Sequence, residues 1–202
     1  VIHHGSKLHL KNQNVKPNPK YSLWFVLALI NSKLIGYYHS KFVSNDLGIF
    51  PQTVSKLPIP EIDFVNESSK QSITIHNKLR DLAKKMINLC KEKHSIIQRT
   101  LGLVDKECGI PVDDWQSKTN ILKFWERVST DWIKSVTNRE NQKRFTNTGK
   151  KSEDKIIQIL SKAKEELQPI LKKINDTDKL IDQVVYRLYG LTEEEIAIVE
   201  GS

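Results

Sequence analysis

Cysteines and long hydrophobic runs are scarce in this sequence, and their scarcity excludes several classes of protein. Cys90 and Cys108 are the only cysteines among 202 residues, so we expect neither a disulfide framework nor a four-ligand zinc site. The most apolar run, Leu23 to Ile30, is too short to span a bilayer, and no charged-then-apolar leader opens the chain. These absences predict a cytoplasmic protein without a membrane segment. The start at Val1, with no methionine, predicts a piece of a longer protein.

Positive charge exceeds negative charge along the chain. There are 32 lysines and arginines against 24 acidic residues, which gives a net charge of +8 and a pI near 9.3. This excess favours a polyanionic partner, with nucleic acid the natural candidate, over an acidic or neutral ligand. A basic surface that merely keeps the protein soluble is the competing interpretation, because net charge bears on association and not on fold.

Apolar residues recur at helical spacing in three parts of the chain. From Tyr21 to Phe42 the spacing predicts a helix with one buried face. Over residues 73–100 and 152–175, alternating steps of three and four residues form heptad seams, which predict two long helices packed antiparallel. Lys93 interrupts the first seam, and Pro169 is expected to kink the second helix. The expected buried positions are Leu23, Val26, Leu27, Ile30, Leu34 and Tyr37; Ile75, Leu79, Leu82, Met86, Leu89 and Ile96; and Ile156, Leu160, Ala163, Leu167, Ile170 and Ile174.

The segments between and after these helices have their own patterns. Three prolines between residues 43 and 62 predict irregular backbone with short edge strands. An insertion over 105–151 carries Trp115, Trp125 and Trp132 at helical spacing, which predicts the core of a helical lobe, followed by a basic loop. Residues 178–200 are expected to form two C-terminal helices separated by Gly190, with Thr192 capping the second.

Two stretches carry a resemblance to a known family. LALINSKLIGYY, with LPIP downstream at Leu57 to Pro60, and the terminal IDQVVYRLYGLTEEEIAIVE from Ile181 to Glu200 resemble the C-terminal specificity region of TaqI-type adenine-specific DNA methyltransferases and related restriction-modification enzymes. The resemblance implies a target-recognition domain that grips double-stranded DNA in a prokaryotic cytoplasm. A separate upstream domain of the same protein would bind S-adenosylmethionine and methylate a flipped adenine. The insertion over 105–151 has no counterpart in this resemblance.

The catalytic parts of such an enzyme are absent from the sequence. The Asn-Pro-Pro-aromatic motif that holds the flipped base does not occur, and no glycine-rich turn follows a strand. We therefore expect no enzyme activity and no cofactor in this fragment. The parent protein would be a site-specific adenine-N6 methyltransferase, with an additional restriction endonuclease activity left open. Glu153, Asp154 and Lys155 offer only half of a nuclease pattern and are expected to open a helix.

Histidines give no metal site in this interpretation. His3, His4 and His9 lie near a chain end without acidic or cysteine companions at ligand spacing. His76 and His94 are expected on a polar helix side without a special role.

Two groups of residues are the candidates for contact with DNA. Asn and Gln side chains pair with adenine and Lys with guanine, so polar residues after the first motif are candidates for base reading. Clustered cations are candidates for phosphate contacts, although a solvated charge run is the commoner explanation. The base-reading candidates are Ser44, Asn45, Gln52 and Lys56, and the phosphate candidates are Lys41, Arg139, Lys143, Arg144, Lys150 and Lys151.

The sequence thus predicts an α+β fold that is predominantly α-helical. Residues 1–62 would form part of a target-recognition lobe, and residues 63–202 a helical domain built from a long antiparallel hairpin with a helical insertion. The predicted function is DNA target recognition without the catalytic domain. The alternative is a coiled-coil-like spacer or protein-interaction module that docks the methyltransferase or another subunit, which a lysine in a heptad seam would favour. The recognised bases and the oligomeric state are left open.

Overall fold

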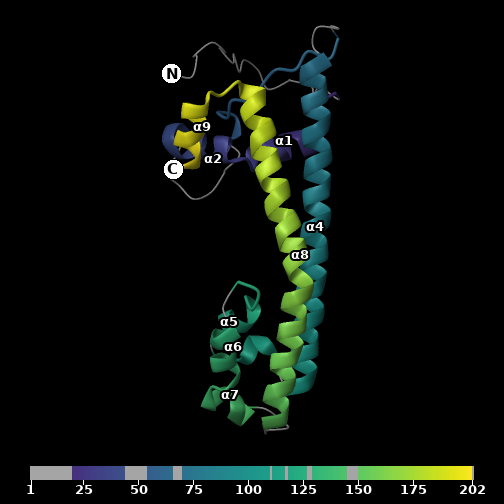
Figure 1. Cartoon of the computed structure of the whole chain (residues 1–202), viewed down its shortest axis with the longest axis vertical. Coiled ribbons are helices and arrows are strands. Elements are labelled where there is room, and N and C mark those ends of the chain that lie inside the picture. Colours follow the sequence, from purple (N-terminus) through teal and green to yellow (C-terminus); the bar gives the residue numbers. More distant parts are fainter. Residues whose placement is uncertain are drawn as a thin grey trace.

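Two long antiparallel helices dominate the structure. The computed structural model describes residues 20–43, 54–65, 70–109, 111–116, 118–126, 129–144 and 150–201. Helix α4 (Lys70–Cys108) has 39 residues and helix α8 (Lys150–Tyr189) has 40, and they pack side by side along most of their length (Figure 1). Leu79, Leu82 and Leu89 of α4 are buried, as are Ile156, Leu160, Ala163, Leu167 and Ile170 of α8. The predicted antiparallel hairpin is confirmed.

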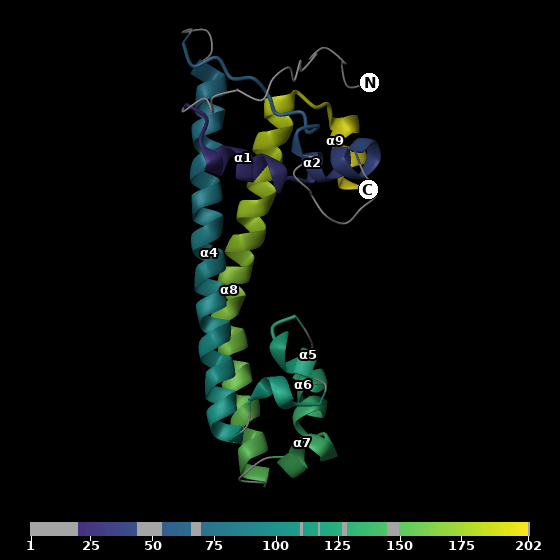
Figure 2. The same cartoon turned by 180° about the vertical axis from the view of Figure 1, so that it is seen from behind.

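Short helices gather at the two ends of the hairpin. At one end lie α1 (Leu23–Ile30), α2 (Lys33–Tyr38), the π-helix η1 (His39–Val43) and α9 (Glu193–Glu200), and the segment 54–65 runs beside them; we call this the upper lobe. At the other end lie η3 (Val112–Asp114), α5 (Lys118–Leu122), α6 (Ser129–Val136) and α7 (Arg139–Arg144), which we call the lower lobe. Both lobes project from the same side of the hairpin, and a length of bare helix pair separates them (Figures 1 and 2).

Each lobe buries its own hydrophobic core against a different half of the hairpin. In the lower core, Trp115, Phe124 and Trp132 pack with Val104 of α4 and Leu160 of α8. The upper core has a separate set of residues, which includes Phe25, Leu29, Leu79, Val185 and Val199. Trp115 and Trp132 of the insertion are buried in this core, as predicted, and Trp125 packs against it. Only Trp132 lies in a helix, α6, whereas Trp115 and Trp125 lie in turns that follow η3 and α5.

The N-terminal helix differs from the prediction in length and in orientation. Ser32 interrupts it by capping α2, because its side chain accepts a hydrogen bond from the backbone N–H of Ile35. Phe25, Ala28 and Leu29 form the buried face of α1, whereas Leu23 is 84% exposed. The predicted buried face is confirmed at Leu34 of α2 but was wrong at Leu23 and Leu27 of α1, because LWFVLALI is apolar all round and its spacing does not specify a buried side.

Helix α8 runs through the break that the sequence predicted between residues 175 and 178. Thr177 is buried, and its hydroxyl donates to the carbonyl of Lys173 at 2.7 Å, so its side chain bonds back into the helix instead of capping a new one. Gly190, at φ 66°, ends the helix as predicted, and Thr192 caps α9 with Glu195 in a reciprocal capping box. At the other turn, Gly109 at φ 71° ends α4, eight residues beyond the predicted end at Thr100.

Two further expectations do not hold in the described part of the chain. It contains no strand, so the α+β prediction is unsupported there and the fold is predominantly helical. His76 is buried instead of lying on a polar helix side: its Nε2 accepts the backbone N–H of Ser22 at 3.1 Å, and its ring packs against Phe25 and Phe64.

Candidate nucleic-acid interface

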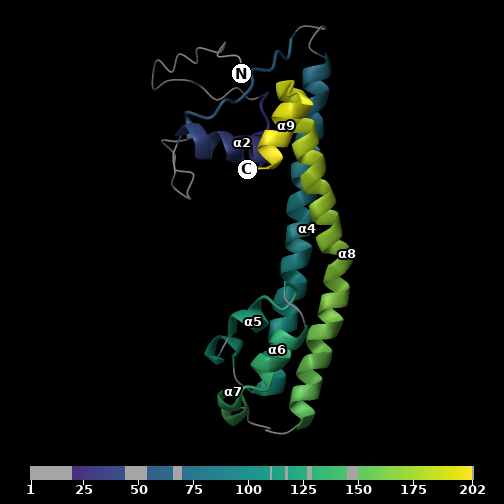
Figure 3. The same ribbon diagram turned by 60° about the vertical axis from the view of Figure 1, so that its left-hand side comes forward.

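The two stretches that carry the family resemblance meet in the upper lobe, although 149 positions separate Lys33 from Asp182. The Asp182 carboxylate accepts the backbone N–H of Lys33 at 2.9 Å and is almost fully buried. Burial raises the pKa of this carboxyl, because its charged form loses hydration. The Lys33 ammonium also donates to Glu200, which accepts the Tyr186 hydroxyl at 2.8 Å. These bonds join α2 to α8 and α9, and Figure 3 shows α2 and α9 together at one end of the hairpin.

Two tyrosine hydroxyls form hydrogen bonds with the LPIP segment and hold it against the same lobe. The Tyr189 hydroxyl donates to the carbonyl of Pro58 at 2.5 Å, and burial raises the pKa of this tyrosine. The Tyr21 hydroxyl donates to the carbonyl of Pro60 at 3.3 Å and accepts the backbone N–H of Ile62 at 2.5 Å. Leu57 is 2% exposed, which anchors the start of the segment. The two stretches of the resemblance, LPIP included, therefore belong to one packed unit.

A groove of about 380 Å³ opens between α2 with its π-helix and α9. Its lining mixes charged, hydroxyl and apolar groups: Lys33, Gly36, Tyr37, Ser40 and Lys41 on one side, and Val199 and Glu200 on the other. Lys33 and Glu200 form an ion pair across it, and this contact lowers the pKa of Glu200. Lys41, a predicted phosphate contact, is exposed at the edge of this groove.

The structure does not bring the predicted DNA contacts together. Lys41 and Lys56 are exposed in the upper lobe, whereas Arg139 and Lys143 are exposed on α7 in the lower lobe, at the opposite end of the hairpin (Figure 1). Lys143 forms an ion pair with Glu140 at 3.0 Å, which offsets part of its charge. Ser44, Asn45 and Gln52 lie outside the described residues, and for Arg144, Lys150 and Lys151 the structure describes the backbone alone.

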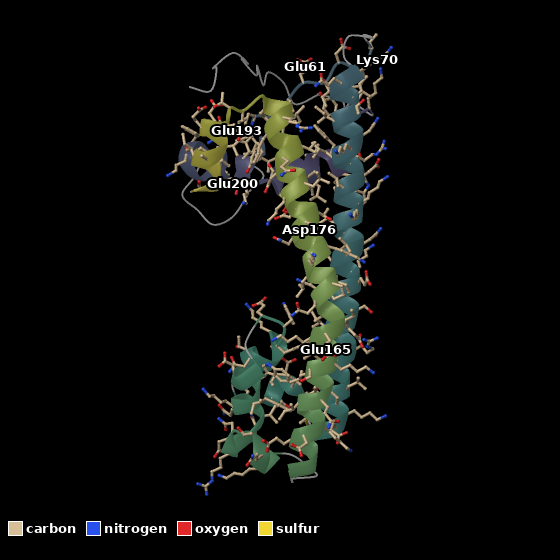
Figure 4. The ribbon with its side chains drawn as sticks, viewed as in Figure 1. Glu61, Lys70, Glu165, Asp176, Glu193 and Glu200 are labelled. Atoms are coloured by element: carbon tan, nitrogen blue, oxygen red, sulfur yellow. The ribbon has the colours of Figure 1, made fainter. Side chains whose placement is uncertain are left out.

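Helix α4 carries exposed cations that were not among the predicted DNA contacts. Lys78, Lys85 and Lys91 are exposed and form no ion pair within the described part of the chain. Figure 4 shows nitrogen-tipped side chains along the side of α4 that faces away from the lobes, below the labelled Lys70. A signal for these residues was present in the sequence, because none of them occupies a seam position and lysines outside a seam are expected to face solvent.

One of the comparisons with known proteins gives a match. A family model described as a domain of unknown function, DUF8810, matches residues 72–185, which is more than half of the chain. The chain belongs to the DUF8810 family. No curated protein and no solved structure matches it. In the fold, the DUF8810 match covers nearly all of the hairpin and the whole lower lobe, and it ends at Val185, before α9.

Within the DUF8810 region, the lysine in the heptad seam has an intramolecular partner. The Lys93 ammonium lies 5.8 Å from the centre of the Trp125 ring, in the range of a cation–π interaction. Lys93 stands between the two cores, where the lower lobe reaches the bare part of the hairpin. This lysine therefore needs no partner from another protein, and it does not favour the protein-interaction alternative.

Other kinds of site find no support in the described residues of this DUF8810 chain. They contain no group of three or more His, Cys, Asp or Glu side chains that could hold a metal ion. None of their helices is long and apolar enough to cross a membrane. Cys108 is buried, and burial raises the pKa of its thiol to about 12, so the reactive thiolate is strongly disfavoured at neutral pH.

Proposed function

We propose that this DUF8810 chain serves DNA target recognition as the specificity fragment of a restriction-modification adenine-N6 DNA methyltransferase. The observation that carries the proposal is the convergence of the two resembling stretches, LPIP included, in the upper lobe. Asp182 of the terminal motif accepts the backbone N–H of Lys33 in the first motif, and Tyr189 of the terminal motif donates to the carbonyl of Pro58 in LPIP. Motifs that come from distant parts of a chain and pack as one unit behave as a single module, which supports treating the resemblance as a whole.

Electrostatics support the same function. The net charge of +8 favours association with a polyanion, and exposed cations occur in both lobes and on α4. Cations that neutralise phosphates would supply affinity, and the polar residues after α2 would read bases. S-adenosylmethionine and the chemistry of methyl transfer would belong to a separate catalytic domain of the parent protein.

Salt-dependent binding to a fluorescently labelled 30-base-pair duplex tests this proposal. If the chain neutralises Z phosphates, the logarithm of the affinity should fall with the logarithm of salt concentration by about 0.9 Z. Replacing Lys78, Lys85 and Lys91 by Ala should flatten that slope if these exposed lysines of α4 take part. A matched triple of exposed lysines on α8, Lys162, Lys172 and Lys173, controls for net charge.

The predicted cation cluster at the lower lobe is tested in the same way. Replacing Lys143, Arg144, Lys150 and Lys151 together by Ala should flatten the slope by a few units, while discrimination between duplexes should change little, because phosphate contacts carry no base information. An unchanged slope would leave this cluster as solvated surface. No measurable duplex binding by the unmodified chain at 50 mM salt would reject the DNA function.

A second function is favoured by one observation. Leu23, Trp24 and Leu27 of α1 are 84%, 37% and 37% exposed, so α1 presents an apolar face to solvent. Such a face suits an apolar surface of the parent's catalytic domain, as expected if the chain works as a docking or spacer module. Leu27→Glu should then abolish association with that domain in a mass measurement in solution and leave duplex binding unchanged.

A further inference from the structure

The groove between α2 and α9 is bordered by an uncommon backbone. Residues His39–Val43 form a π-helix directly after α2, and Lys41 lies in this turn. π-helical turns are rare and occur frequently at functional sites, because they widen the helix and redirect side chains. The opposite wall comes from Val199 and Glu200 at the end of α9. The groove therefore joins chain segments that only the folded upper lobe brings together.

Gly36 lines this groove, and the folding of α2 does not require a glycine at this position. It lies in the middle of α2, and a Cβ atom built on it would meet no heavy atom within 4 Å. Its φ is not in the left-handed region, which among the described glycines only Gly109 and Gly190 adopt. Alanine would fit and would favour the helix more than glycine does. A glycine that packing and backbone conformation do not require is consistent with close approach of another molecule.

The charges in the groove favour an anion. Two lysines and one glutamate leave one positive charge, and Lys41 forms no ion pair among the described residues. Glu200 is already engaged by Lys33 and by the Tyr186 hydroxyl. The Tyr37 hydroxyl, which has no hydrogen-bond partner in the described part of the structure, can donate to a further acceptor. The Ser40 hydroxyl donates to the carbonyl of Tyr37 at 2.9 Å and is not free to donate elsewhere.

We propose that this groove seats one phosphate and its sugar from the backbone of duplex DNA. The backbone would pass over Gly36, and Lys41 and the Tyr37 hydroxyl would hold the phosphate oxygens. Gly36 thereby becomes a residue whose lack of a side chain serves binding and not folding. The inference rests on the proposed function, since it specifies where the upper lobe holds DNA.

Gly36→Ala tests the proposal because binding and stability should change in opposite directions. The matched control is Gly102→Ala, since Gly102 is also exposed, lies inside α4, and has no heavy atom within 4 Å of its Cβ position. Both variants should raise the melting temperature of the 202-residue chain by about 2 to 4 °C. Gly36→Ala should weaken binding of the labelled 30-base-pair duplex by about tenfold, while Gly102→Ala should bind like the unmodified chain. Lys41→Gln should reduce the salt slope by about 0.9.

The outcomes separate this inference from the function on which it rests. Equal duplex binding by the unmodified chain and by Gly36→Ala would overturn the groove proposal and leave DNA recognition standing. Absence of salt-dependent binding by the unmodified chain would overturn both. Titration with inorganic phosphate distinguishes the source of the anion. The groove would be assigned to free phosphate by two results together. Phosphate would raise the melting temperature of the unmodified chain but not that of Lys41→Gln, and Gly36→Ala would bind the duplex as the unmodified chain does.

Discussion

In Leu160→Ala, the lower core should unfold at a much lower denaturant concentration than in the unmodified chain. The side chain is fully buried between α8, α4 and the lower lobe, so truncation removes buried methyl groups and leaves a cavity. Changes of this kind cost about 2 to 5 kcal/mol, and for a protein of this size each kcal/mol lowers the melting temperature by about 2 to 4 °C. The melting temperature should therefore fall by roughly 4 to 20 °C. Leu82→Ala should cost a similar amount in the upper core, where Leu82 is 8% exposed.

The two cores can be followed separately by spectroscopy. Three of the four tryptophans belong to or pack against the lower core, so fluorescence reports mainly on that core, whereas circular dichroism reports on all helices. Leu160→Ala should shift the fluorescence transition more than the dichroism transition. Leu103→Ala, at a 47% exposed position of α4, is the control and should stay within about 0.5 kcal/mol. A loss that small for Leu160→Ala would show that the predicted seam is not core.

Three further predictions follow from single contacts and from the sequence. Lys93→Gln removes the cation over the Trp125 ring and should destabilise the protein by about 0.5 to 1 kcal/mol in chemical denaturation; no change would show the contact to be incidental. Because Asp182 has a pKa raised above its ordinary value of 3.8, the folded state binds its proton more tightly than the unfolded state. The contribution of Asp182 to the free energy of unfolding should therefore fall as pH rises from its pKa in the unfolded state to its higher pKa in the folded state. In Asp182→Asn, whose side-chain oxygen can still accept the N–H of Lys33, this pH dependence should disappear; an unchanged profile from pH 3 to 7 would contradict it. Calorimetric titration with S-adenosylmethionine should show no binding, and saturable binding at micromolar concentration would refute the prediction that the cofactor belongs to another domain.

The long hairpin could be predicted from sequence because a heptad seam specifies both the helix and its buried side. Leu79, Leu82 and Leu160 are buried where the spacing placed them. The continuity of α8 could not be predicted in this way. A Thr-Asp pair is a good helix start, and only burial of Thr177 with its bond to Lys173 shows that this threonine bonds back into the helix instead.

The candidate site was harder to predict than the scaffold. Lys41 was identified from its type and position, but the groove beside it depends on α9, whose Glu200 is 167 positions away from Lys33. No local pattern reports such a contact. The helical pattern around Gly36 gave no reason to single it out, because the argument for this glycine depends on the open space around its Cβ position, which only the folded lobe defines.

The bare part of the hairpin sets the distance between the two lobes. An α-helix rises 1.5 Å per residue, so one heptad added to both α4 and α8 would move the lobes apart by about 10.5 Å with only a small relative rotation. Neither core would change, because each packs against its own half of the helices. At about 3.4 Å per base pair, one heptad corresponds to roughly three base pairs of duplex. If the chain binds DNA as proposed, DUF8810 chains whose hairpins differ in length by whole heptads would place their two lobes over contact points whose spacing differs in steps of about three base pairs.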